Sequence, residues 1–102
     1  MRKTIFERAV SGAGLISAER QRQIERENFT AAHDDQHSDG DLVRAAVAYI
    51  DPNGPFKWPD GRAPDFTKHG HVERLVIAGA LLAAEIDRLL RQRAATEGGE
   101  DV

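Results

Sequence analysis

Apolar residues recur at helical spacing near the C-terminal end of the chain, between residues 71 and 93. Successive members are three or four residues apart, which places them on one face of an α-helix. They are Leu75, Ala78, Gly79, Leu82, Ile86 and Leu89. Further apolar residues widen this stripe, which predicts a central helix with several neighbours.

A second apolar stretch runs from Leu42 to Ile50. It is apolar almost all the way round, so the helix that it predicts should be well buried. Ser38 and Asp41 have the spacing of a capping box, which places the helix start near Ser38 or Asp39. Pro52 ends the helix, because proline lacks the amide hydrogen that a helix interior requires.

Two further helices are predicted from weaker patterns. Residues 3–10 have apolar positions on one side, and residues 11–14 (Ser-Gly-Ala-Gly) should break that helix. Ser17 is a good N-cap for a helix that runs to about Glu27. Its interior is nearly all long polar side chains, so it should lie on the outside of the molecule. Residues 28–40 are expected to form a polar connector.

The chain between residues 51 and 67 contains all four prolines and predicts a long irregular loop. Residues 95–102 end the chain with an acidic stretch, which predicts a flexible tail. No stretch alternates as a strand does. We therefore expect an all-α fold, a small bundle of three to four helices with a long proline-rich loop, in a single helical domain over residues 1–94.

The composition narrows the class of protein. A chain of 102 residues is long enough for one small domain. The absence of cysteine excludes disulfides, thiolate metal sites and cysteine nucleophiles. There is no apolar run of membrane-spanning length and no signal-peptide pattern at the charged N-terminus, so we expect a cytoplasmic protein without membrane contact.

The segment from His33 to His37, His-Asp-Asp-Gln-His, is the first candidate for chemistry. Two histidines four residues apart share a helix face and are a known arrangement for binding a metal. Asp35 and the more distant Glu85, which a helical wheel places on an apolar face, would complete such a set. The alternative is structural: the aspartates cap turns, the histidines form surface hydrogen bonds, and Glu85 joins two helices as an internal ion pair.

The acidic residues of the same region suggest a second site. Asp34, Asp35, Asp39 and Asp41 lie within eight residues without a lysine or arginine among them. They are suited to a divalent cation or to a basic protein surface that normally holds nucleic acid. Negative charge at a helix N-terminus explains them equally well.

Two aromatic residues of the proline-rich loop, Phe56 and Trp58, are the third candidate. A rigid loop that exposes aromatic side chains makes a good binding anchor, because little entropy is lost on binding. In the alternative, Trp58 folds back and covers the small core. The sequence Ala78-Gly79-Ala80 would let another helix approach closely, which includes the helix of a second copy.

Several of these motifs occur together in a known order. Glu-Arg-x-x-Gln-Ile at residues 19–24 precedes His-Asp-Asp at residues 33–35, an alanine-rich helix, Trp58-Pro59 and Ala-Glu-Ile-Asp-Arg-Leu at residues 84–89. Over residues 16–93 the chain resembles a group of small phage and prophage proteins, to which no common activity is attached. Where that group usually has Gly-Trp-Thr, this chain has Asn-Phe-Thr at residues 28–30.

The resemblance implies a phage or prophage origin. Small acidic-to-neutral phage proteins of this size are often inhibitors of host defence, so we expect an inhibitor of the anti-CRISPR type. Such a protein would bind a host protein or ribonucleoprotein complex and block its nucleic-acid site, without catalysis, cofactor, metal or direct contact with nucleic acid. The expected contacts are Asp34, Asp35, Asp39, Asp41, Phe56 and Trp58, and a homodimer is compatible with this role. It would act in the cytoplasm of the host cell.

The alternative function is a metal-dependent nucleotide pyrophosphohydrolase, with His33, Asp35, His37 and Glu85 as the ligands. The chain is weakly similar to the all-α enzymes of the MazG type. Those enzymes hold magnesium with Glu-x-x-Glu and Glu-x-x-Asp pairs, and this chain has no clean Glu-x-x-Glu. Asp41 and Asp87 would have to join Glu85, and Asp87 points away from it.

Overall fold

The computed structural model describes residues 11–51, 56–64 and 68–100, which are α-helical or irregular and contain no strand. The helices of these ranges are α2 (Gly12–Arg26), α3 (Ala31–Asp35), α4 (Asp41–Ile50) and α5 (His71–Glu100). The all-α class with three to four helices is confirmed. The predicted helix at residues 3–10 and parts of the proline-rich loop, at 52–55 and 65–67, lie outside the described residues.

Helix α2 begins earlier than the sequence predicts. Ser11, rather than Ser17, is the N-cap, and its hydroxyl accepts a hydrogen bond of 3.0 Å from the Gly14 amide. Of the segment predicted to break the preceding helix, Ser11 is extended, whereas Gly12, Ala13 and Gly14 form the first turn of α2. A capped first turn offsets the cost of its two glycines, and packing of α2 against α5 supplies the rest.

The predicted connector at residues 28–40 contains a short helix. Asn28 adopts a left-handed conformation with φ 61°, and this turn ends α2 and directs Phe29 into the core. Thr30 then caps α3, because its hydroxyl accepts a hydrogen bond from the His33 amide. A left-handed Gly40, rather than Ser38 or Asp39, precedes α4. The capping-box prediction therefore placed the start of α4 about two residues too early.

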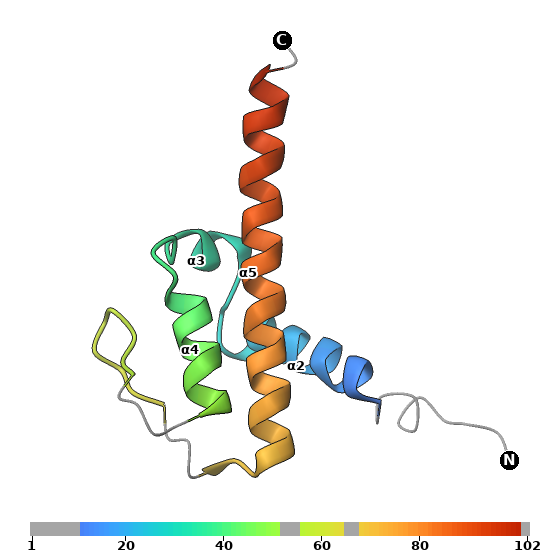
Figure 1. Cartoon of the computed structure of the whole chain (residues 1–102), viewed down its shortest axis with the longest axis vertical. Helices are drawn as coiled ribbons and strands as arrows, with labels where there is room; N and C mark the ends of the chain where they lie inside the picture. The colour runs from blue at the N-terminus through green and yellow to red at the C-terminus, as the bar shows by residue number, and fades with distance from the viewer. Residues whose placement is uncertain (1–10, 52–55, 65–67, 101–102) are drawn as a thin grey trace, which may run out of the picture.

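Helices α4 and α5 lie side by side and run in opposite directions (Figure 1). The buried apolar core lies between them, with Phe29 added from the segment before α3. Its other members are small or branched residues: Leu42, Ala45, Ala46, Ile77, Ala78, Leu81 and Ala84. Both apolar stretches therefore contribute residues to the core, but the buried face of α5 is not the predicted stripe. Of that stripe Ala78 is buried, whereas Leu75, Leu82, Ile86 and Leu89 are exposed. The prediction that the helix over Leu42 to Ile50 is buried almost all round is also wrong, because Val43, Val47 and Ile50 are exposed.

Helix α5 contains 30 residues and continues to Glu100, beyond the predicted end at about Arg93. Its C-terminal part extends past the other helices (Figure 1). Nearer its start, a Cβ atom at Gly79 would lie 2.6 Å from Cδ1 of Ile16 in α2. The helix that approaches Ala78-Gly79-Ala80 is therefore α2 of the same chain, and Ala78 and Ala80 are buried. In the described ranges, no helix is both long and apolar enough to cross a membrane.

Candidate functional site

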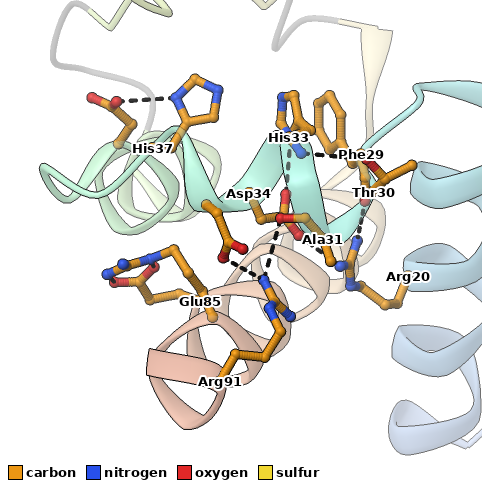
Figure 2. A network of polar contacts seen from close by, with 12 residues as sticks. Arg20, Phe29, Thr30, Ala31, His33, Asp34, His37, Glu85 and Arg91 are labelled. Carbon is orange, nitrogen blue, oxygen red and sulfur yellow. Dashed lines mark hydrogen bonds and ion pairs between the residues drawn. The ribbon is translucent and has the colours of Figure 1, made fainter. Parts of the chain in front are cut away.

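A buried ion pair joins α2 to α3. The Asp34 side chain is fully buried, and its Oδ2 accepts a hydrogen bond of 2.8 Å from Nη2 of Arg20 (Figure 2). Nη1 of Arg20 donates to the Phe29 carbonyl at 3.2 Å. The other carboxylate oxygen of Asp34 lies 2.9 Å from Nδ1 of His33. Both oxygens of this carboxylate are thus used inside the chain, which makes Asp34 a structural residue.

A second histidine–carboxylate pair lies one turn further on. Nδ1 of His37 is 3.0 Å from Oδ2 of Asp41, and the other oxygen of Asp41 accepts a hydrogen bond from Arg44. The hydrogen bond with His37, followed by that with Arg44, lowers the pKa of Asp41 below its ordinary value. Because Asp41 stands in the first turn of α4, its charge also suits the helix N-terminus.

The two imidazole rings belong to an aromatic cluster. The His33 ring stacks on Phe29 with 4.3 Å between centroids and 5° between planes. The His37 ring lies 4.6 Å from the His33 ring and 5.2 Å from the Trp58 ring. Trp58 also meets Phe56 edge to face. Both histidines therefore pack as half-buried rings, each with its Nδ1 directed at a carboxylate.

Of the four residues expected to bind a metal, His33 and His37 lie close together, but Asp35 and Glu85 do not join them. Asp35 pairs instead with Arg91 of α5, at 2.8 Å. Glu85 is buried and paired with Arg88 of the same helix, by hydrogen bonds of 2.7 and 3.0 Å that raise the pKa of Arg88. The described residues contain no group of three or more His, Asp or Glu side chains placed to hold a metal ion. Glu85 forms an ion pair, as the structural alternative expected, but within one helix and not between two.

The residues expected to contact a partner are divided between interior and surface. Asp34 and Asp41 are buried and paired, whereas Asp35 and Asp39 are exposed. Phe56 and Trp58 are half-buried and pack against the core. The geometry of Trp58 is that of the alternative in which the loop covers the core.

A cleft of about 640 Å³ opens beside this aromatic cluster. Helix α2, the loop at 56–64, Tyr49 of α4 and the first half of α5 form its walls. Phe29, Tyr49 and Trp58 supply aromatic surface, and Ile77 and Leu81 supply aliphatic surface. Burial raises the pKa of the Tyr49 phenol, so this hydroxyl stays protonated at neutral pH.

Gln23 is an unusual residue in the wall of this cleft. It is 2% exposed, and its Nε2 donates a hydrogen bond of 3.3 Å to Oε2 of Glu19. A carboxylate only accepts hydrogen bonds, so the amide nitrogen must be the atom that faces Glu19. The carbonyl oxygen Oε1 of Gln23 is then buried with no donor among the described residues. Such an atom costs free energy unless a ligand or water supplies a donor.

The charged residues around the cleft are mostly paired with one another. Arg22 donates to both Glu19 and Glu27, and these carboxylates raise its pKa. Arg62 pairs with Asp60 at 2.7 Å. Lys68 is exposed at the rim and forms no ion pair with any residue that the structure describes. Among the described residues that line the cleft, Lys68 is therefore free to meet an anionic group.

The sequence contained a weak signal for Gln23. Ile16, Arg20 and Gln23 follow at helical spacing and share one face of α2, yet only Ile16 is apolar. The charged neighbours of Gln23 suggested an external helix. Its burial accompanies the packing of α2 against α5, which the sequence does not indicate.

No protein-family profile matches this chain, and neither the curated proteins nor the solved structures contain a match to it.

Proposed function

We propose that this protein binds a small heteroaromatic molecule of the nucleoside or nucleotide class in the cleft beside Trp58. The observation that carries this proposal is the cleft of about 640 Å³ with aromatic walls, whose lining includes Gln23, a residue with a buried Oε1 that lacks a donor among the described residues. A ring amino group or ring N–H would supply this donor once the groups that cover Oε1 move aside, because less than 1 Å² of that atom is accessible in the free protein. A planar ring also matches the aromatic surfaces of Phe29, Tyr49 and Trp58.

The size and charge of the cleft are consistent with this class of ligand. Its volume of about 640 Å³ lies within the usual range for small-molecule sites, about 300–1,000 Å³. Lys68 at the rim favours an anionic group such as a phosphate at the outer end of the ligand. The proposal concerns binding, and it assigns no chemical step to the cleft.

The test is a thermal-shift and calorimetry series on the whole chain with the common nucleosides and their mono- and triphosphates. We expect one base to raise Tm, with dissociation constants in the micromolar range. Replacing Gln23 by leucine keeps the volume and removes the acceptor. This Q23L change should leave the free protein at least as stable, because it removes an unpaired buried carbonyl, and should weaken binding at least 10-fold.

The matched control is Gln21→Leu on the same helix, where the glutamine is exposed and bonded to Glu25. It should leave affinity unchanged. Lys68→Gln distinguishes a nucleotide ligand from a nucleoside ligand. It should weaken the binding of nucleotides, because it removes the cation that faces the phosphate, and leave the binding of nucleosides unchanged. Absence of binding to every compound at millimolar concentration would refute the proposal. Repeating the series with magnesium, manganese, zinc and chelator tests the pyrophosphohydrolase alternative.

The inhibitor of a host defence complex stays a prediction. The structure changes the variants that can test it, because Asp34 and Asp41 support the fold. The exposed residues Asp35 and Asp39 remain suitable. If the prediction holds, the purified protein binds a CRISPR surveillance complex and displaces its nucleic acid, and Asp35→Lys with Asp39→Lys abolishes both effects in a folded chain. Unchanged inhibition by this variant would contradict an acidic contact.

A further inference from the structure

The α4–α5 pair has a face of large apolar side chains that nothing in the described chain covers. Three lie on α4 and four on α5, each between 38% and 57% exposed. They are Val43, Val47, Ile50, Leu75, Leu82, Ile86 and Leu89. We call these seven residues the bare face. Contiguous apolar patches of a few hundred Å² on small proteins are often interaction sites.

Helix geometry places the seven residues on one side of the pair. Each residue advances about 100° around a helix. On α4 the exposed residues lie further round the helix, in the direction of advancing residue number, than the buried Leu42 and Ala46. On α5 the exposed residues are displaced in the same sense from the buried Leu81 and Ala78. The two helices are antiparallel (Figure 1). Helix geometry therefore directs both displacements to the same side of the α4–α5 plane. The cleft residues Tyr49 and Ile77 are displaced the other way, so the cleft and the bare face lie on opposite sides.

The bare face has the pattern of a helix-packing surface. On α5, Leu75, Leu82 and Leu89 are seven residues apart, and Ile86 follows Leu82 by four. This is the spacing at which one helix packs along another. None of the seven side chains is charged, so burying them against a similar surface desolvates no ion.

The area agrees with what a stable homodimer needs. The exposed fractions of the seven residues correspond to roughly 550 Å² of accessible surface per copy. A standard interface buries about 800 Å² per partner, and about 65% of that area is apolar in homodimers, which is about 520 Å². Arg44 and Arg93 flank the apolar positions in the helix sequences and would contribute polar surface to a rim.

We propose that two copies of this chain associate through the bare face, so that two α4–α5 pairs form a four-helix interface. A two-fold axis brings the same patch of each copy together, which a self-complementary apolar surface favours. The cleft stays open in this dimer, because it lies on the opposite side. The inference therefore stands or falls independently of the proposed ligand.

Sedimentation velocity on the whole chain, from 1 to 300 µM, is the first test. We expect a species of twice the 11.2 kDa monomer mass at the higher concentrations. Ile86→Glu places a charge in the interface and should weaken dimerisation at least 100-fold while the helical circular dichroism is retained. The control is Asp87→Lys, at the next position but outside the face, which should leave the dimer unchanged.

A crosslink locates the interface. The chain has no cysteine, so Val47→Cys introduces a single thiol near the middle of the bare face. It should form a disulfide-linked dimer on mild oxidation, whereas Ser17→Cys on the exposed side of α2 should form one far more slowly. A monomeric wild-type chain at 300 µM, or an Ile86→Glu variant that still dimerises, would overturn the proposal.

Discussion

The two sides of the α4–α5 pair differ in a way that reverses the usual distribution of residues. On the side that α2, α3 and the 56–64 loop cover, the interior contains the charged Arg20–Asp34 pair and the amide of Gln23. On the opposite side, leucine, isoleucine and valine side chains face solvent. Polar groups are thus buried on one side and apolar groups exposed on the other.

The difference shows that burial of apolar surface alone does not explain which side of the α4–α5 pair the other helices cover. A buried ion pair adds little net stability, but it penalises any packing in which its two charges are separated. The covered side is therefore fixed in one geometry by directional contacts. The bare face has only apolar surface, and burial of that surface lowers the free energy without requiring a particular direction of contact.

The largest effect is expected from breaking the buried pair on the covered side. Asp34→Ala leaves the Arg20 guanidinium without its carboxylate, which should cost about 3–5 kcal/mol of unfolding free energy. Its neighbour Asp35 pairs with Arg91 at the surface, so Asp35→Ala should cost at most about 1 kcal/mol. Urea denaturation followed by circular dichroism measures both. Equal losses for the two variants would show that the covered side is not held by this pair.

The adjacent residues Leu81 and Leu82 allow a direct comparison of the two sides. Leu81 is 1% exposed and Leu82 is 38% exposed. Leu81→Ala should cost about 2–5 kcal/mol of unfolding free energy, because it leaves a cavity in the core. Leu82→Ala should cost less than about 1 kcal/mol at a protein concentration where the chain is monomeric. A loss at Leu82 as large as that at Leu81 would mean that the bare face is covered within the monomer.

A smaller effect is expected where α2 crosses α5. Gly79→Ala places a methyl group against Ile16, and the overpacking should outweigh the gain in helix propensity by about 1 kcal/mol. Ile16→Val removes the Cδ1 atom that the new methyl group meets. A double-mutant cycle should therefore show a favourable coupling of at least about 0.5 kcal/mol between the two changes. Gly12→Ala, where a Cβ atom meets nothing within 4 Å, is the control.

The smallest effect concerns acid. The pKa of Asp41 is lower in the folded chain than its ordinary value of 3.8. Between these two values the unfolded chain binds more protons, so this contribution to stability is present above about pH 4 and is lost as the pH falls further. Removing the His37 hydrogen bond with His37→Phe should reduce that acid-dependent loss. Measurement of the unfolding free energy from pH 7 to pH 2.5 would show no such reduction if the hydrogen bond does not form in solution.

The sequence predicted the elements whose signal is periodic. The stripe from Leu75 to Leu89 and the apolar run from Leu42 to Ile50 became α5 and α4, because apolar residues at helical spacing indicate a helix. The stripe did not identify the buried face of α5, since Leu75, Leu82, Ile86 and Leu89 are exposed. Apolar periodicity did not predict the short elements. α3 has five residues, too few for a period, and depends on its Thr30 cap and on the Arg20–Asp34 contact.

The site depended still more on tertiary structure. The sequence made His33, Asp34 and His37 candidates for metal or partner binding. A run of histidines and aspartates gives the same sequence pattern whether its side chains face solvent or bond to one another. Gln23 was passed over because its neighbours are charged.

The sequence by itself thus determined the helical class and the two core helices, through local periodicity. The tertiary structure alone decided which carboxylates are paired, which amide lines the cleft and which apolar face stays bare. The physical reason is that each of these depends on contacts between residues far apart in the chain, and periodicity within one helix contains no information about the neighbour that covers it.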